Sequence, residues 1–202
     1  MAFSVPLLAA ASENEAVRLA YDAMALGADA IMCQWSPRFI SAATEAGVPV
    51  QGHAGLVPRK STWTGGLRAV GKTLDEALWV YREIKALEDA GAYAVEVEVI
   101  PEGLLAEISK RTSLLTSSIG GGNGGDIQFL FADDILGNNP PPYPRHSKQY
   151  CSLFKLKSRC KPSGWPVFSP SSTTSERWIS GTWTACRCPG RPDRRISRGG
   201  RG

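Results

Sequence analysis

The sequence predicts an α/β fold built on a parallel sheet, and two observations indicate it. Segments with helical periodicity alternate with short apolar segments from residue 12 to residue 131. At three junctions a glycine ends the helix and a strand pattern follows at once, in GADAIM, GVPVQG and GAYAVEV. Parallel strands need such helical crossovers, whereas antiparallel strands are joined by short hairpin turns.

Four helices are expected, over residues 12–26, 37–46, 73–90 and 101–110. The helix over 73–90 has the clearest signals, because Thr73 and Glu76 form a capping box and Gly91 follows its last turn. Its apolar residues recur at helical spacing. They predict the buried face as Leu74, Leu78, Tyr81, Ile84 and Leu87.

Strands are expected over residues 28–33, 48–50, 92–100, 114–118 and 127–131. In the segment over 92–100, Glu96 and Glu98 stand two residues apart and therefore lie on the same side of the strand. A parallel strand in a barrel has no solvated face, so both carboxylates need partners such as a metal ion or the polar rim.

The segment SSIGGGNGGD (117–126) places glycines in the GxGxxG spacing of dinucleotide-binding loops. A true dinucleotide loop belongs to the first βα unit and opens directly into a helix. Here the glycines follow at least three βα units and lead into the strand-like DIQFLF, and no Lys-Ser or Lys-Thr of a P-loop follows them. We interpret the segment as a glycine-lined turn at the carboxyl end of a barrel strand, where small residues leave room for a ligand.

Charge and cysteine content divide the chain near residue 150. Residues 1–150 hold 12 Lys and Arg against 17 Asp and Glu, whereas residues 151–202 hold 11 against 2. Cys33 is alone in the first part, and the other four cysteines fall in the second. We therefore expect one incomplete (β/α) barrel domain over 1–150 and a basic, irregular and disordered tail over 151–202 rich in Ser, Pro and Arg.

The tail lacks the paired C-x2-C spacing of zinc sites, and its Arg and Gly residues favour at most unspecific contact with phosphates. Binding of nucleic acid as a function is therefore not expected. The N-terminus has no basic region before its apolar run, and no run reaches the roughly 18 apolar residues of a membrane span. A cytoplasmic protein is the expectation.

At GVPVQGHAGLVPRK (47–60) the sequence resembles the ketopantoate hydroxymethyltransferase family, whose members carry a stretch similar to GIPVMGHIGLTPQ. Further similar segments follow in the family's order: Gly65-Gly66, Gly71-Lys72-Thr73, LEDAGAYAVEVEVIP (87–101) and SSIGGGNGGDIQFLFADDILG (117–137). Several motifs in register over about residues 12–150 make a chance similarity improbable.

The resemblance implies a TIM-type (β/α)8 barrel of the phosphoenolpyruvate and isocitrate lyase group. It also implies transfer of a hydroxymethyl group from 5,10-methylenetetrahydrofolate to 3-methyl-2-oxobutanoate, which gives ketopantoate for pantothenate synthesis. In the family a Mg²⁺ ion binds the 2-oxo acid, a base removes the proton beside the carbonyl, and the enolate attacks the one-carbon unit. A homo-oligomer is implied as well.

By resemblance the catalytic base is Glu98, and the substrate-binding positions are His53, Met32, Gly120 and Gly122. Two of the family's residues are replaced, since Met32 stands for a lysine that contacts the oxo acid and Gln34 for a carboxylate in the metal shell. Gln34 offers a carbonyl oxygen to Mg²⁺ but no charge. The chain is expected to lack the first two strands of the barrel, and no acid occurs at Ser4–Pro6, where the third strand would carry one.

Two further residues have structural roles in this interpretation: Asp126 caps the glycine turn, and Asp134 caps a helix that begins near Ile135. The replacements leave alternatives open. The chain is a one-carbon transferase, an inactive or weak relative retaining a binding or oligomerisation role, or a lyase or mutase acting on another small 2-oxo acid.

Overall fold

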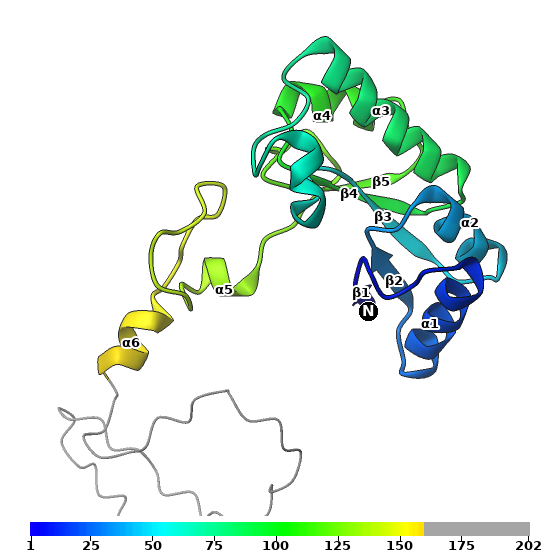
Figure 1. Cartoon of the computed structure of the whole chain (residues 1–202). Coiled ribbons are helices and arrows are strands. Elements are labelled where there is room, and N and C mark those ends of the chain that lie inside the picture. Colours follow the sequence, from blue (N-terminus) through cyan, green and yellow to red (C-terminus); the bar gives the residue numbers. More distant parts are fainter. Residues whose placement is uncertain (160–202) are drawn as a thin grey trace, which may run out of the picture.

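The computed structural model describes residues 1–159 of the chain. Six parallel strands form one sheet, in which neighbours in sequence are also neighbours in space (Figure 1). The strands are β1 (Ala2–Val5), β2 (Ala30–Cys33), β3 (Val50–Gly55), β4 (Ala94–Glu98), β5 (Leu115–Ile119) and β6 (Ile127–Gln128). This strand order is that of a (β/α) barrel, whereas a doubly wound sheet reverses its order at a switch point. The expected α/β class and partial barrel are confirmed.

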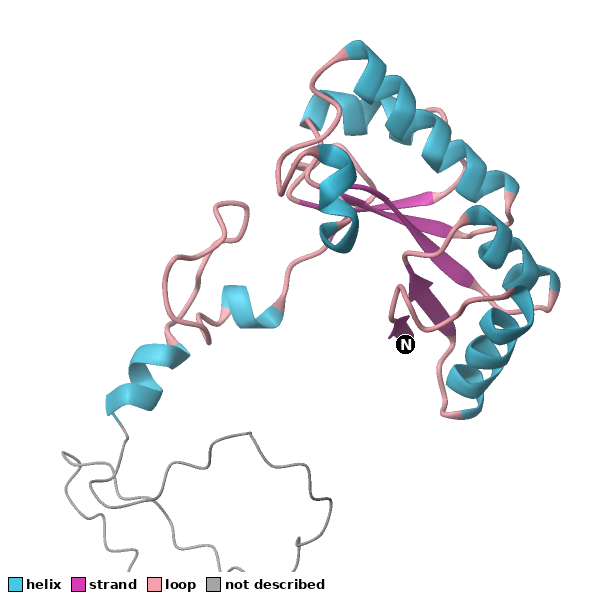
Figure 2. Cartoon of the chain, in the orientation of Figure 1, coloured by secondary structure: helices cyan, strands magenta, loops and turns pink. Residues whose placement is uncertain are grey.

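The main helices cover one face of the sheet, as Figure 2 shows. They are α1 (Glu13–Ala25), α2 (Pro37–Glu45), α3 (Leu74–Asp89) and α4 (Glu102–Ser109). A 3-10 helix, η1 (Pro58–Thr64), follows β3, and the short helices α5 (Ala132–Ile135) and α6 (Leu153–Arg159) come after the sheet. The helix positions expected from the sequence agree with α1 to α4 to within one or two residues.

The hydrophobic core lies between the sheet and these helices. Val95 and Val97 of β4 are fully buried there, and Gly52 of β3 lies so close to Leu87 of α3 that an added Cβ would be 2.9 Å from that side chain. Because side chains alternate along a strand, His53, Glu96 and Glu98 belong to the opposite face, inside the curve of the sheet. The fold thus separates an apolar face under the helices from a polar inner face.

Four expectations about elements need correction. Strand β3 begins at Val50, after Pro49, and runs on to Gly55, while β6 ends at Gln128 rather than at residue 131. On α3 the buried residues are Val80, Ile84 and Leu87, and the predicted core residues Leu74 and Leu78 are 75% and 40% exposed.

The fourth correction concerns the tail, which was expected to be irregular from residue 151. Helix α6 occupies the beginning of this tail. Its first two N–H groups bind it to the two residues that follow α5: the Leu153 N–H donates to the Leu136 carbonyl, and the Phe154 N–H donates to the Gly137 carbonyl. The remainder of the predicted tail, residues 160–202, lies outside the described residues, and so do Cys160, Cys186 and Cys188.

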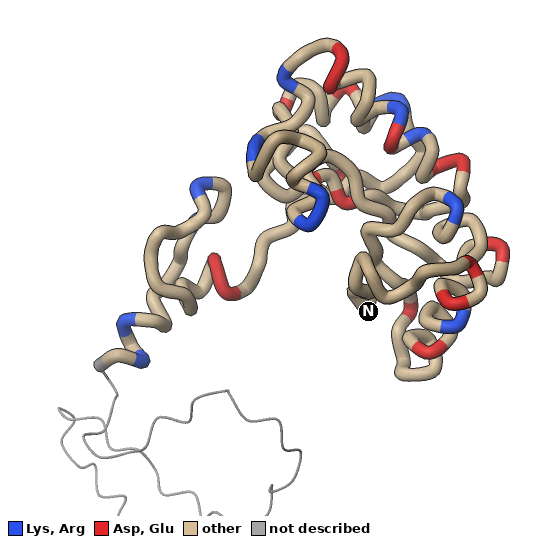
Figure 3. Tube along the Cα trace, viewed as in Figure 1, with Lys and Arg blue, Asp and Glu red and all other residues tan. Residues whose placement is uncertain are grey.

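Charged residues of residues 1–159 lie mostly on the helices and loops around the sheet (Figure 3). Acidic side chains on a buried strand, such as Glu96 and Glu98, are therefore exceptions that need a local explanation. Among the helices of residues 1–159, none is long and apolar enough to cross a membrane.

Candidate active site

The candidate site begins with the pairing of β3 and β4. In their parallel register His53 lies beside Glu96, and Gly55 beside Glu98. Glu98 is therefore the last residue of β4, at the carboxyl end of the sheet, which is where barrel enzymes carry their catalytic groups. The residues of the inner face thus meet at the end of the sheet that the fold uses for chemistry.

His53 and the two glutamates form a compact buried cluster. The Nε2 atom of His53 lies 3.2 Å from Oε2 of Glu98 and 3.0 Å from the carbonyl oxygen of Leu56, and Nδ1 lies 3.8 Å from Oε2 of Glu96. His53 and Glu96 are buried, while the side chain of Glu98 is 18% exposed. Glu98 is therefore the most exposed member of the cluster, whereas His53 is the member that lines a cavity.

The charge of His53 follows from this geometry. Burial disfavours the imidazolium, but Glu96, Glu98 and the Leu56 carbonyl outweigh it and raise the pKa of His53 to about 9. The ring is thus a cation at neutral pH. It holds one oxygen of the Glu98 carboxylate, and the other oxygen has no hydrogen-bond partner among residues 1–159.

The backbone around Glu98 is tightly fixed. The Leu56 N–H donates to the Glu98 carbonyl at 2.9 Å, and a Cβ on Gly55, whose φ is +85°, would lie 2.5 Å from that oxygen. Val99 has a φ of 49°, a conformation that costs a β-branched residue on the order of 1–3 kcal/mol. Hydrogen bonds from the Val99 N–H to Ile119 and from the Val70 N–H to Val99 hold the strained residue in place.

Two of the predicted positions, Met32 and Gln34, share a cavity with His53. The cavity has a volume of about 250 Å³ and is also lined by Ser4 and Arg59. Gly120 and Gly122, by contrast, line a different cavity of about 160 Å³, together with Ser118, Gln128 and His146. The structure therefore brings His53 and Glu98 together and places Met32 and Gln34 beside His53, but it puts the two glycines in a neighbouring hollow.

The glycine segment forms a turn after a strand, as its sequence context indicates. It leads from β5 into β6 and not into a helix, and Gly120 and Gly122 have φ values of 68° and 75°. The Asp126 carboxylate accepts hydrogen bonds from the N–H and hydroxyl of Thr116, and these bonds lower its pKa. Asp126 thus ties the turn to β5, as expected. Asp134 does not cap a helix, because α5 starts earlier, at Ala132.

Sequence reasoning missed one contact and one residue of the site. The contact is that of Glu96 with His53, which depends on the register of two strands far apart in the sequence. The residue is Arg59. Arg59 reaches the cavity because η1 turns the chain back after β3. Its signal was present in the sequence, since Arg59 stands at the glutamine of the family stretch GLTPQ.

The donor groups present do not fit the Mg²⁺ ion that the family implies. Mg²⁺ requires about six oxygen ligands and usually at least one carboxylate. Among the described residues, no Asp or Glu lines the cavity of Gln34, and Arg59 adds a positive charge there. His53, Glu96 and Glu98 offer three ligand atoms within 4.8 Å of one another, but a nitrogen donor suits Mg²⁺ poorly, and the carboxylates already face the imidazolium.

Comparisons with known proteins agree with the motifs. The model of the family described as ketopantoate hydroxymethyltransferase matches residues 1–160. Curated 3-methyl-2-oxobutanoate hydroxymethyltransferases are similar: that of Thermotoga maritima is 35% identical over 72% of this chain and 55% of its own length. That of Hyperthermus butylicus is 39% identical over 74% of this chain and 52% of its own.

Solved structures show a weaker likeness. An aldolase named QR15 has a TM-score of 0.44 at 16% identity, covering 58% of this chain and 52% of its own. The deoxyribose phosphate aldolase of Aeropyrum pernix has a TM-score of 0.42 at 16% identity, covering 58% and 49%. The chain spans about half the length of the curated relatives it matches. On the family match, the chain belongs to the ketopantoate hydroxymethyltransferase family.

Proposed function

We propose that the chain takes part in hydroxymethyl transfer from 5,10-methylenetetrahydrofolate to 3-methyl-2-oxobutanoate, and that Glu98 is the base. The observation that carries this proposal is the geometry of Glu98, a partly exposed carboxylate at the carboxyl end of β4 with one oxygen held by His53 and the other unpaired among residues 1–159. A base has to present an unpaired oxygen to the proton that it removes.

In the proposed reaction Glu98 takes the proton from C3 of the oxo acid, and the electron pair of the broken C–H bond forms an enolate. One C–N bond of the folate's methylene bridge opens as its nitrogen takes the proton that Glu98 removed, and the enolate carbon bonds to the methylene carbon. Water then displaces the second folate nitrogen, giving its hydroxyl group to the methylene carbon and its remaining proton to that nitrogen. His53 contributes by orienting the carboxylate and by placing a positive charge near the developing enolate. Because the residues do not fit Mg²⁺, no step is assigned to a metal ion.

The proposal also covers the cellular location of the protein and its assembly into a homo-oligomer. A cytoplasmic location is proposed as well; Cys33 and Cys151 form no disulfide within residues 1–159, which is compatible with a reducing compartment. A homo-oligomer is proposed from the family resemblance and from the two edges of the sheet, at β1 and β6, that have no partner strand among residues 1–159.

The alternative is an inactive or weak relative that still binds the oxo acid. It is favoured by Met32 and Gln34, which replace a lysine and a carboxylate of the family pattern. Exchange of the C3 proton separates the two possibilities, because it needs only the base and the oxo acid and does not need the folate.

The test is to follow exchange of the C3 proton of 3-methyl-2-oxobutanoate in D2O by NMR. The wild-type chain should accelerate exchange, and Glu98→Gln should lower the rate by about 10²-fold or more while leaving binding intact. Glu45→Gln, an exposed carboxylate at the end of α2, is the matched control and should leave the rate unchanged. Binding without exchange in the wild-type chain would favour the inactive relative, and equal rates for the wild type and Glu98→Gln would remove Glu98 from the role.

A further inference from the structure

The cavity beside His53 has the charge of an anion site. Among residues 1–159 its lining contains Arg59 and His53 and no acidic side chain. Glu96 and Glu98 are the acids nearest to His53, and both face the imidazolium, so neither is left to offset a divalent cation. A metal ion would be repelled by Arg59 in such a site, whereas a carboxylate would be attracted.

Arg59 is available for this role. It is exposed, it lies in the first turn of η1 directly after β3, and no carboxylate of the described part of the chain pairs with it. Its neighbour Lys60 is already engaged, since the Lys60 ammonium donates to the Gln34 carbonyl at 3.4 Å. A guanidinium binds a carboxylate with two parallel hydrogen bonds, which gives orientation as well as attraction.

The size and the other walls of the cavity suit a small branched acid. A volume of about 250 Å³ is below the range of roughly 300–1,000 Å³ that is typical for drug-sized ligands. Met32, Val5 and Leu7 supply apolar surface, and Ser4 and Gln34 supply polar atoms. The replacement of a family lysine by Met32 therefore does not leave the site without a cation, because Arg59 enters the same cavity from η1.

We propose that this cavity binds the carboxylate of a small 2-oxo acid directly through Arg59, without a divalent metal ion. The identity of the acid rests on the proposed function, but the mode of binding does not. In this arrangement the acid is held by the positive side chain of Arg59, which follows the carboxyl end of β3.

The first test compares two acids with and without metal. The full chain is titrated calorimetrically with 3-methyl-2-oxobutanoate and with 3-methylbutanoate, which lacks the chelating 2-oxo group, in EDTA and again in Mg²⁺. Direct binding predicts dissociation constants that agree within about twofold between EDTA and Mg²⁺, and a measurable affinity for both acids. A requirement for Mg²⁺, or the absence of binding in EDTA, overturns the proposal.

The second test replaces Arg59 by glutamine, the neutral residue that stands at this position in the family stretch GLTPQ. Arg59→Gln should raise the dissociation constant in EDTA by about tenfold or more, because a charge-assisted hydrogen bond is lost, and Arg59→Lys should have an intermediate effect. Arg82→Gln, which changes an exposed arginine of α3 with no ion pair within residues 1–159, is the control and should bind as the wild type does. Unchanged binding by Arg59→Gln overturns the assignment.

The two proposals fail separately. Binding of the acid without metal, but with no exchange of its C3 proton, would support the anion site and contradict the proposed transferase function. Exchange of the proton, together with binding of the acid that requires Mg²⁺, supports the transferase and removes the anion site.

Discussion

His53 couples the chemistry of the site to the stability of the fold. Its two ring nitrogens face acceptors on both sides, with the Glu96 carboxylate near Nδ1 and the Leu56 carbonyl and Glu98 near Nε2. A neutral imidazole carries only one N–H, so it would turn a lone pair toward one of these oxygens. Only the imidazolium satisfies every neighbour, and this is the physical reason why the cluster favours the charged ring.

The folded state should therefore lose stability as pH rises above 6.5. The pKa of His53 is raised from about 6.5 in the unfolded chain to about 9 in the folded protein. The stabilisation is complete below pH 6.5 and disappears as pH rises through 9. Urea unfolding between pH 6 and pH 8.5 should show a falling free energy of unfolding. This range stays below pH 9.0, the ordinary pKa at which the Cys33 thiol ionises in the unfolded chain, while burial raises that pKa to about 12 in the folded protein.

Two variants check that this loss comes from His53. His53→Asn should show a nearly flat free energy over the same pH range. Glu96→Gln should move the fall to lower pH, because it removes the first of the two carboxylates that hold the charge. A flat curve in the wild-type chain would mean that the pKa of His53 does not change on folding, and a curve that rises with pH would mean that the ring is neutral in the folded protein.

Sequence reasoning found the residues of this cluster but not their pairing. Glu98 and His53 follow from the family motifs, and the shared side of Glu96 and Glu98 follows from the two-residue period of a strand. That Glu96 faces His53 depends on the register between β3 and β4, in which these two residues are paired. Such contacts join residues far apart in the chain, and no local pattern records them.

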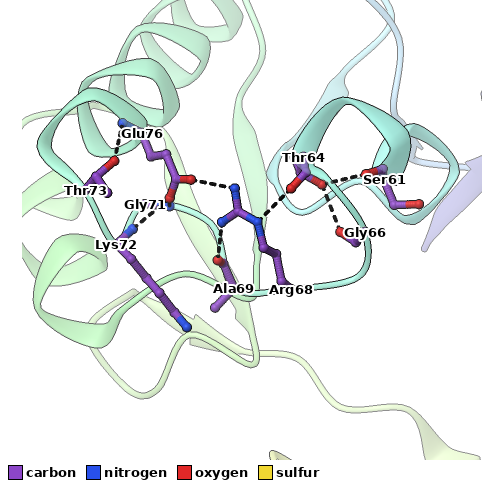
Figure 4. Close-up of polar contacts among 9 residues, drawn as sticks. All are labelled: Ser61, Thr64, Gly66, Arg68, Ala69, Gly71, Lys72, Thr73 and Glu76. Carbon is purple, nitrogen blue, oxygen red and sulfur yellow. Dashed lines mark hydrogen bonds and ion pairs between the residues drawn. The ribbon is translucent and has the colours of Figure 1, made fainter.

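At the scale of elements, the start of α3 is joined to η1 by one arginine and one glutamate (Figure 4). Arg68 donates to the carbonyls of Thr64 and Ala69 and to the Glu76 carboxylate, which in turn accepts from the N–H groups of Gly71 and Lys72. The capping box is therefore only partly as predicted. The Thr73 hydroxyl accepts from the Glu76 N–H as expected, but the Glu76 carboxylate accepts from the N–H groups of Gly71 and Lys72 and not from that of Thr73. The loop between η1 and α3 is thus fixed by the helix cap.

Removal of this cap should weaken the protein measurably. Thr73→Ala deletes the acceptor for the Glu76 N–H and should lower the free energy of unfolding by about 1 kcal/mol. Chemical denaturation at constant pH measures the change. Thr62→Ala is the matched control, because Thr62 is exposed and its side chain makes no hydrogen bond within residues 1–159. Equal losses in the two variants would show that the cap contributes nothing specific.

Helix α3 also shows where periodicity misleads. Its buried residues, Val80, Ile84 and Leu87, lie from the middle of the helix to its C-terminal end, and none lies in its first turn. The apolar residues of the first half, Leu74 and Leu78, instead line a groove shared with Leu104 and Ile108 of α4. A helical period identifies an apolar stripe, but it does not tell how far along the helix the sheet extends.

At the scale of the molecule, the sheet has two unpaired edges within residues 1–159, at β1 and β6. The central strands β3, β4 and β5 each have neighbours on both sides, and β4 is paired along its whole length. Strand β6 pairs through only two residues, and β1 only with β2. A complete barrel has no such edges, and exposed parallel edges are sites at which another chain can pair.

Hydrogen exchange followed by mass spectrometry should show that amide protection decreases from the central strand β4 to the edge strands β1 and β6. Amide groups of β4 should exchange slowest, and those of β1 and β6 faster by about tenfold or more, because edge strands open without disrupting the core. The experiment is run at two protein concentrations, and α1 is the internal control because its hydrogen bonds lie within the helix. Protection of β1 equal to that of β4, and rising with concentration, would contradict a free edge. It would show instead that a second copy pairs with the sheet there, as the proposed homo-oligomer allows.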